Sequence, residues 1–533
     1  MSQMLFWIWS VAVLVALALY IRQKYSWFSR QGVKNLTPCP PVGNGIRLWL
    51  GLDHFTVDAE KTYDSFPKER FIGRYDFFIP LVIVRDLELI KKIAVKDADH
   101  FIDHRTFIDK DIDPIFGRNL VSLKGDEWRD MRGTLSPAFT SSKIRLMVPF
   151  MVEVGDQMTD VLKKKILDSN DGYIDVEMKD LTTRYANDVI ATCAFGLKVN
   201  SHTDENNEFY IRGKEASDFK FKQVLIFLGF MLFPKIIKMF KITLLSKEAT
   251  KFFRKTILGT MQHREDNNIF RPDMIHLLME AKKGSLTHDV KGTDEDAGFA
   301  TVEESTIGTK QVIREWTDDD LIAQAVIFYM AGFDTVSTCM SFLMHELAVN
   351  PDVQNKLFKE IMENEEKNGG KFDYNTVQKM TYLDMVVSEA LRLWPPAPAL
   401  ERQCVQNYNL GKPNADATED YIIQAGHGVA FPVWSIHRDP RYFPDPLRFD
   451  PERFSEQNKH NIKPYSYMPF GLGPRNCIGS RFALCEVKVM VYQLLKNMEL
   501  SPASKTKIPA ELSKTELNLR IDGGFWVRMR ART

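Results

Sequence analysis

Cys477 lies near the end of the chain, in a stretch whose residue types suit metal ligation. The stretch runs from Phe470 to Gly479 as FGLGPRNCIG, and its glycines and proline predict a tight loop rather than a strand. Apolar residues then recur at helical spacing, so the cysteine comes just before a helix. The N–H groups at the helix start, together with Arg475, favour an ionised sulfur, which is the form that ligates metals. The alternative for a cysteine in this position is a buried structural thiol.

An acid and an alcohol lie side by side in a second stretch. Asp334 and Thr335 end the sequence AGFDT, within a largely apolar segment that begins at Thr317 and runs to Asn350. Threonine followed by three aspartates predicts a helix start, and the helix would be longer than most in globular proteins. An acid in an apolar helix is costly unless it is used or well bonded. The alternative is a solvent-facing aspartate beside a threonine bonded to its own helix.

Two further pairs have spacings that place both members on one helix face. Trp128 and Arg132 lie four residues apart, and Glu389 and Arg392 lie three apart, shortly before Pro395. Charged pairs at this spacing are usually exposed and contribute well under ~1 kcal/mol. The apolar neighbours of Glu389 and Arg392 predict instead that this pair is buried.

Together these stretches resemble the motifs of the cytochrome P450 family. The cysteine loop matches the family's Phe-x-x-Gly-x-Arg-x-Cys-x-Gly at every defined position, which are Phe470, Gly473, Arg475, Cys477 and Gly479. AGFDT resembles the family's oxygen-activation motif. Glu389 and Arg392 resemble its Glu-x-x-Arg, which Arg453 completes as a structural triad. The resemblance covers nearly the whole chain.

The resemblance implies a role for each of these residues. Cys477 would be the thiolate ligand of the iron of haem b, and Phe470 would lie against the sulfur side of the haem. Thr335 would hydrogen-bond dioxygen during its activation, while Asp334 would help to relay protons. The haem propionates would be met by one tryptophan and three arginines: Trp128, Arg132, Arg402 and Arg475.

The resemblance also implies the elements that position these residues: the mainly α-helical cytochrome P450 fold with a smaller β-rich region, on a single N-terminal transmembrane helix. The chain has 533 residues, 44% of them hydrophobic, which is enough for a large core. The 70 basic and 70 acidic residues cancel, so nothing indicates nucleic-acid binding. Six scattered cysteines do not form a disulfide framework, which indicates a reducing compartment.

The N-terminal segment predicts a membrane anchor. Residues 2–21 carry no charge, and about 20 apolar residues suffice to cross a bilayer. Basic residues follow at once, which places the body in the cytosol. A cleaved signal peptide is the alternative, but it would have a positive charge before the apolar run. We expect an anchor at 2–21, a basic and proline-rich linker at 22–45 and one catalytic domain at 46–533, on the cytosolic side of the endoplasmic reticulum membrane.

Two other segments have a distinctive composition. Residues 224–240 are apolar with interleaved lysines, which indicates either a pair of core helices or a membrane-interfacial patch beside a substrate channel. Residues 282–311 are polar and predict a mobile, solvated loop. Details around His104, Phe139 and residues 301–308 resemble the insect microsomal branch called family nine.

The function implied by the resemblance is that of a membrane-bound monooxygenase. It would insert one oxygen atom from O2 into lipophilic small molecules, such as plant toxins, insecticides or endogenous lipids. Electrons would come from NADPH through NADPH–cytochrome P450 reductase, with cytochrome b5 as an optional second donor. Two alternatives are a haem-thiolate isomerase or dehydratase, which would not need the Asp334–Thr335 pair, and a non-catalytic haem-binding sensor.

Overall fold

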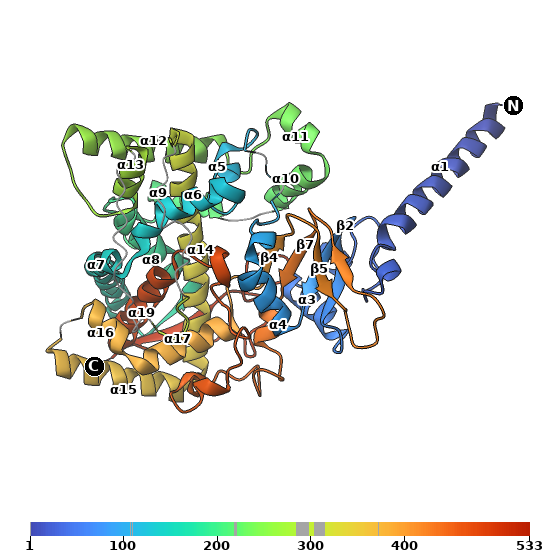
Figure 1. The fold of residues 1–533 in the computed structure, drawn as a ribbon. Helices are drawn as coiled ribbons and strands as arrows, with labels where there is room; N and C mark the ends of the chain where they lie inside the picture. Colours follow the sequence, from blue (N-terminus) through green and yellow to red (C-terminus); the bar gives the residue numbers. More distant parts are fainter. Residues whose placement is uncertain are drawn as a thin grey trace. The chain divides into compact units, whose positions relative to one another are not determined.

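The computed structural model describes residues 2–106, 108, 110–217, 221–283, 298–302, 315–370 and 372–532. Contacts divide the chain, shown in Figure 1, into two units. The first comprises Met1–Arg105, Pro398–Ile436 and Pro464–Ser466, and the second comprises Thr106–Ala397, His437–Lys463 and Tyr467–Thr533. Strands contribute most to the first unit and helices to the second.

A four-stranded sheet, in the order β1–β2–β7–β4, forms the centre of the first unit. Phe71 of β1 lies opposite Val84 of β2 in an antiparallel pair, while β2 and β7 are parallel and β7 and β4 antiparallel. Aromatic and β-branched residues favour these strands. The elements of this unit are α2 (Ile46–Trp49), α3 (Phe55–Asp64), β1 (Phe71–Asp76), β2 (Ile79–Val84), α4 (Leu87–Lys91), β4 (Leu400–Gln403), β5 (Tyr408–Gly411), β6 (Tyr421–Ile423), β7 (Gly428–Phe431) and α18 (Val433–His437).

The N-terminal helix α1 spans Ser2–Tyr25. Its residues Gln3–Tyr25 are long and apolar enough to cross a bilayer, and its most apolar part is not buried within the protein. Arg22 and Lys24 lie in its last turn, where positive charge favours the helix end. The predicted fold class, mainly helical with a smaller strand region and an apolar N-terminal helix, is confirmed.

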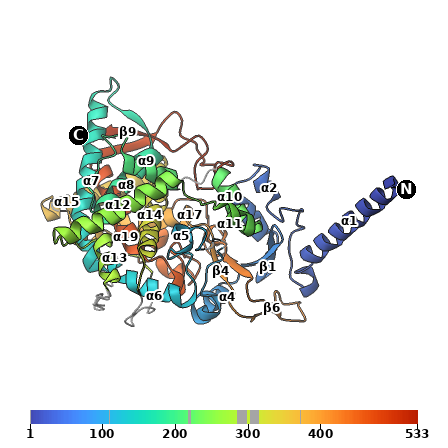
Figure 2. The ribbon, with the colours of Figure 1, turned by 90° about the horizontal axis from the view of Figure 1, so that it is seen from above.

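The second unit is built around the long helix α14, which spans Asp318–Val349. It is surrounded by α8, α12, α17 and α19 (Figures 1 and 2). The elements of this unit are α5 (Pro114–Gly117), α6 (Gly125–Leu135), α7 (Ser141–Leu167), β3 (Ile174–Glu177), α8 (Met178–Cys193), α9 (Glu208–Ser217), α10 (Phe221–Leu232), α11 (Pro234–Phe240), α12 (Lys247–Asp266), α13 (Met274–Lys282), α14, α15 (Pro351–Asn368), α16 (Tyr374–Lys379), α17 (Thr381–Leu393), α19 (Ser480–Asn497), β8 (Met498–Pro502) and β9 (Trp526–Ala531). Strands β3, β9 and β8 form its sheet.

The ends of α14 are set by local sequence, as predicted. The Thr317 N–H donates to Asp320 Oδ2 at 2.9 Å, and the Asp320 N–H donates to Thr317 Oγ1 at 3.3 Å, which is a capping box. The helix ends at Asn350, directly before Pro351. Although α14 is apolar enough to cross a membrane, 67% of its most apolar part is buried inside the protein. It is therefore a core helix.

Glu389 and Arg392 of α17 are fully buried, with both side chains 0% exposed. Arg392 donates to the two carboxylate oxygens of Glu389 at 2.7 and 2.8 Å. Arg453 Nε lies 3.4 Å from Glu389 Oε1. The prediction of a buried pair with Arg453 as its third member is confirmed, and removal of one member would leave an uncompensated buried charge.

Most of the predicted solvated loop at 282–311 lies outside the described residues, as do residues 303–308 of the segment that resembles family nine. Residues 298–302 are described. Ala300 is only 3% exposed, and Phe299 packs against two other aromatic rings. For Phe299 and Ala300 the prediction of a solvated loop is wrong, because polar composition did not reveal the single aromatic anchor.

Candidate active site

The cysteine loop has the predicted form, a tight turn that enters a helix. The Cys477 N–H donates to the carbonyl oxygen of Phe470 at 2.8 Å, which closes the loop. Gly471 and Gly473 have φ values of 81° and 65°, which favour glycine. Helix α19 begins at Ser480, three residues after the cysteine.

Cys477 is exposed, whereas Arg475 and Asn476 before it are buried. Desolvation by the surrounding protein raises the pKa of the Cys477 thiol, and the N–H of Gly479 and the charge of Arg132 lower it by less. As expected, the helix start and a nearby arginine favour ionisation, but the arginine is Arg132 rather than Arg475, and burial outweighs both. A bound metal ion deprotonates a coordinating thiol outright, whatever the pKa of the thiol by itself.

Arg132 holds the residue that precedes the cysteine. Its guanidinium donates to the carbonyl oxygen of Asn476 at 2.9 Å and to Asn476 Oδ1 at 2.8 Å. Both residues are buried, with Arg132 6% exposed. Helix α6 thus places a positive charge beside the cysteine loop.

Trp128, one turn earlier on α6, pairs with the loop itself. The guanidinium carbon of Arg475 lies 3.9 Å from the centre of a Trp128 ring, a cation–π contact. Arg475 also donates to the carbonyl oxygens of Leu120 and Leu123 at 3.2 and 2.7 Å. Three of the predicted site residues, Trp128, Arg132 and Arg475, therefore come together at the cysteine loop.

The remaining predicted cofactor contacts are Phe470 and Arg402. Phe470 is partly accessible at the start of the loop. Arg402 belongs to the first unit, on β4, where it is 2% exposed and donates to the carbonyl oxygen of Glu401 at 2.9 Å. Burial lowers its pKa to about 10. An anion close to such a desolvated cation would be strongly favoured.

One face of α14 is accessible near Thr335. Ala331 and Thr335 are exposed and Phe328 is partly so, at helical spacing, and Thr335 Oγ1 donates to the carbonyl oxygen of Ala331 at 2.5 Å. The Phe328 ring lies 5.2 Å from that of Phe139, whose Cε1 is 3.6 Å from the position of a methyl group on Gly479. Phe139 therefore lies between this face of α14 and the end of the cysteine loop.

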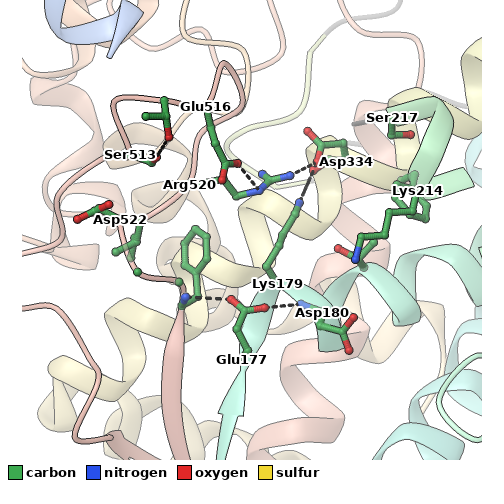
Figure 3. A pocket seen from close by; sticks show the side chains of 17 residues that line it. Glu177, Lys179, Asp180, Lys214, Ser217, Asp334, Ser513, Glu516, Arg520 and Asp522 are labelled. Atoms are coloured by element: carbon green, nitrogen blue, oxygen red, sulfur yellow. Dashed lines mark hydrogen bonds and ion pairs between the residues drawn. The ribbon is translucent and has the colours of Figure 1, made fainter. Parts of the chain in front are cut away.

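Asp334 faces a different, polar pocket of about 480 Å³ (Figure 3). Arg520 Nη2 lies 2.7 Å from Asp334 Oδ1, and Lys179 Nζ lies 3.0 Å from the same oxygen. Asn518 donates to Asp334 Oδ2 at 3.2 Å. The alternative of a solvent-facing Asp334 is therefore wrong, because two cations bind its carboxylate. The alternative of a Thr335 bonded to its own helix is correct.

The charges in this cluster oppose the effect of burial. Burial raises the pKa of Asp334, but Lys179 and Arg520 outweigh it and the pKa is lowered overall. Burial lowers the pKa of Lys179 to about 8, even though Asp334 raises it. Lys179 also donates to Ser337 Oγ at 2.6 Å and Thr338 Oγ1 at 2.8 Å. The carboxyl of Asp334 is therefore ionised at neutral pH.

Sequence reasoning did not identify Lys179 or Arg520. They lie 155 and 186 residues from Asp334 along the chain. Neither belongs to a recognisable motif, so their positions next to Asp334 follow only from the packing of α8 and the C-terminal loop.

Comparison with known proteins extends the resemblance over the whole chain. The family model described as Cytochrome P450 matches residues 34–526. Cytochrome P450 9e2 of Blattella germanica is 42% identical over 541 aligned residues, which cover 99% of this chain and 98% of that protein. Cytochrome P450 9c1 of Drosophila melanogaster is 36% identical, with 95% of each chain covered. Cytochrome P450 6k1 of Blattella germanica is also 36% identical, with 96% and 94% covered.

Proposed function

The chain belongs to the cytochrome P450 family and is a haem-dependent monooxygenase, and on this premise we propose that it oxidises lipophilic small molecules at the endoplasmic reticulum membrane, with Cys477 as the iron ligand. The observation that carries the proposal is the exposed Cys477 in a loop held by buried Arg132 and Arg475. The family uses O2, a small-molecule substrate and a redox partner.

The residues around Cys477 fit haem b. When bound, haem supplies a redox-active iron at which dioxygen is activated. A thiolate is a suitable soft ligand for iron, and guanidinium and indole N–H groups are donors that suit carboxylates. Cys477 would hold the iron. The propionates would be met by the four residues predicted for this role, Trp128, Arg132, Arg402 and Arg475, and Phe470 would contribute apolar contact.

Thr335 and Asp334 would provide the hydrogen-bonding and proton-handling groups. The Thr335 hydroxyl lies on the accessible face of α14 and would turn from Ala331 to donate to dioxygen. Asp334 lines the polar pocket and would receive protons from water there. A haem-thiolate isomerase or dehydratase would need neither group, so this pair favours the monooxygenase.

An exposed patch of apolar and basic side chains on α10 and α11 supports the proposed membrane contact and lipophilic substrates. The two helices are short and meet at a bend of 117°, so the pair is not a straight span. Their exposed apolar side chains are Leu225, Phe227, Phe233, Ile236, Met239 and Phe240, with Lys235 and Lys238 between them. Phe230, by contrast, is 2% exposed and packs inside the protein. Exposed apolar and basic side chains on short helices are typical of interfacial segments.

The remaining parts of the proposal follow from family membership. Electrons would reach the protein from NADPH–cytochrome P450 reductase, with cytochrome b5 as an optional second donor. Residues 2–21 would anchor the chain, and residues 22–45 would link the anchor to the body while Phe28 and Val33 pack in the core of the first unit. Residues 46–533 would form the catalytic domain on the cytosolic side.

The test is turnover of the full-length, haem-loaded protein with reductase in lipid vesicles. We expect NADPH and O2 to be consumed together with formation of an oxygenated product from lipophilic compounds. Conversion of a hydroperoxide without NADPH would instead identify an isomerase or dehydratase. Haem binding with no turnover across a broad substrate panel would favour a sensor.

A further inference from the structure

The segment Gly298–Val302, which we call the Phe299 segment, lies against elements that lead into the cysteine loop. We propose that Phe299 is a positioning residue for this loop: it packs on Tyr467, three residues before Phe470, and so steadies the chain that presents Cys477. The inference rests on the proposed role of Cys477 as iron ligand.

An ion pair between the partly buried Asp384 and the fully buried Lys488 anchors the Phe299 segment. The Phe299 N–H donates to Asp384 Oδ2 at 2.9 Å. The other oxygen of Asp384 lies 2.8 Å from Lys488 Nζ, and the side chain of Lys488 is 0% exposed. Asp384 belongs to α17 and Lys488 to α19, the helix that begins just after the cysteine loop. The segment is therefore tied to both helices.

The fit at Gly298 is too close for any other residue. Its φ is +94°, and a methyl group there would lie 2.2 Å from Asp384 Oδ1 and 3.2 Å from Lys488 Nζ. The Thr301 N–H donates to the carbonyl oxygen of Gly298 at 3.2 Å, so the segment turns on itself at this point. Close approach, a required glycine and a buried Ala300 indicate a specific docked conformation.

Three aromatic rings meet at Phe299. The ring centres of Phe299 and Phe454 lie 5.0 Å apart, those of Phe299 and Tyr467 5.5 Å, and those of Phe454 and Tyr467 5.1 Å. Tyr467 also stacks on His437 at 5.4 Å and donates to the carbonyl oxygen of Ser388 at 3.0 Å. Phe299 thus closes one side of the site that holds the Tyr467 ring.

The residues after Tyr467 carry this restraint to the cysteine. The Met468 N–H donates to His437 Nε2 at 2.9 Å. Two residues later the carbonyl oxygen of Phe470 accepts the N–H of Cys477 at 2.8 Å. Residues that contact a metal ligand fix the orientation of that ligand. A Tyr467 side chain with fewer contacts should therefore leave the position of the Cys477 sulfur less well fixed.

The test compares variants of the full-length, haem-loaded protein. The measurement is the rate at which the reduced carbon monoxide complex loses its thiolate-type Soret band in mild denaturant, alongside the melting temperature. Phe299→Ala should lose the band roughly fivefold faster or more, as expected for lost aromatic contacts. Phe299→Leu should be intermediate, and Phe299→Tyr, which keeps the ring, should stay within about twofold of the wild type.

The matched control is Phe372→Ala. Phe372 is likewise half-buried and stacks on a tyrosine, with its ring centre 3.9 Å from that of Tyr492 in the last half of α19. This variant should lower the melting temperature without accelerating loss of the band. If Phe299→Ala loses the band no faster than Phe372→Ala, or Phe299→Leu no faster than the wild type, Phe299 does not position the loop. Either result would leave the role of Cys477 as iron ligand unaffected. Absence of the band in the wild type would overturn the role of Cys477 and this inference with it.

Discussion

Arg520 and Asp334 form an ion pair, with Nη2 and Oδ1 2.7 Å apart, that joins the C-terminal loop to the middle of α14 (Figure 3). Lys179 shares the same carboxylate oxygen. The acid of the predicted oxygen-activation motif is therefore part of a structural charge cluster as well as a candidate for proton transfer. Its two roles need to be separated by experiment.

Asp334→Asn should destabilise the protein as well as slow turnover. It removes the charge partner of Lys179 and Arg520, whose side chains are 12% and 15% exposed. Breaking a fully buried pair costs about 3–5 kcal/mol, and partial exposure of Asp334 reduces this to about 1–3 kcal/mol. Thermal unfolding measures the change. The control is Asp175→Asn, which breaks the more exposed ion pair with Arg528 and should have a smaller effect. Equal melting temperatures for the wild type and Asp334→Asn would contradict the structural role of the Asp334 cluster.

Thr335→Ala should impair oxygen activation without destabilising the protein. The hydroxyl is exposed and bonds only within its own turn to Ala331, among the contacts of the described chain, so the melting temperature should stay near that of the wild type. Product formed per NADPH should fall by about tenfold, with hydrogen peroxide released instead, because proton delivery is impaired. Thr335→Ser retains a hydroxyl and should recover much of the coupling. Unchanged coupling of Thr335→Ala across several substrates would count against the proposed role.

Glu346 on α14 should make stability depend on pH. Burial raises its pKa to about 7 from 4.5, although Trp394 Nε1 donates to its Oε1 at 2.8 Å. Between these values the folded protein binds more protons than the unfolded chain, so stability falls as pH rises from 4.5 to about 7. Glu346→Gln should remove this loss and be more stable than the wild type by up to about 3 kcal/mol above pH 7.

Chemical denaturation at pH 5 and pH 8 measures the effect of Glu346→Gln, since other titrating groups are common to both proteins. We expect the advantage of the variant to grow from the lower to the higher pH. The same difference at both values would show that Glu346 does not titrate in this range.

Protein that lacks residues 1–21 should still bind liposomes through α10 and α11. The deletion stops there because Phe28 and Val33 are 0% and 2% exposed and belong to the core of the first unit. Each inserted apolar side chain contributes roughly 1.5–3 kcal/mol, so Phe233→Asp with Phe240→Asp should weaken binding in a sedimentation assay. Phe270→Asp, at another exposed phenylalanine, is the control. If the truncated protein stays in the supernatant when the liposomes are sedimented, these helices do not contact lipid.

Local features of the site could be predicted from the sequence. The glycines around Cys477 set the turn, Thr317 and Pro351 set the ends of α14, and the apolar neighbours of Glu389 set its burial. Each depends on residues close together in the chain. The matching motifs then indicated the family, which the comparisons establish.

Features that depend on distant packing could not be predicted. Arg520 reaches Asp334 across 186 residues, and Phe299 reaches Asp384 across 85. The net direction of the Cys477 pKa also depends on packing, because desolvation by surrounding protein exceeds the lowering effects of the helix start and of Arg132. In each case the contact or the pKa depends on which distant parts of the chain surround the side chain, and not on its neighbours in sequence.

The role of Cys477 as iron ligand is tested most directly by the spectrum of Cys477→Ala in the reduced, carbon monoxide-bound state. Cys485→Ala is the control, since Cys485 is fully buried on α19, eight residues from Cys477 along the chain. Only a thiolate ligand gives the strongly red-shifted Soret band of this complex. We expect Cys477→Ala to lose the band and Cys485→Ala to retain it. A Cys477→Ala protein that keeps the band would contradict the assignment of the iron ligand.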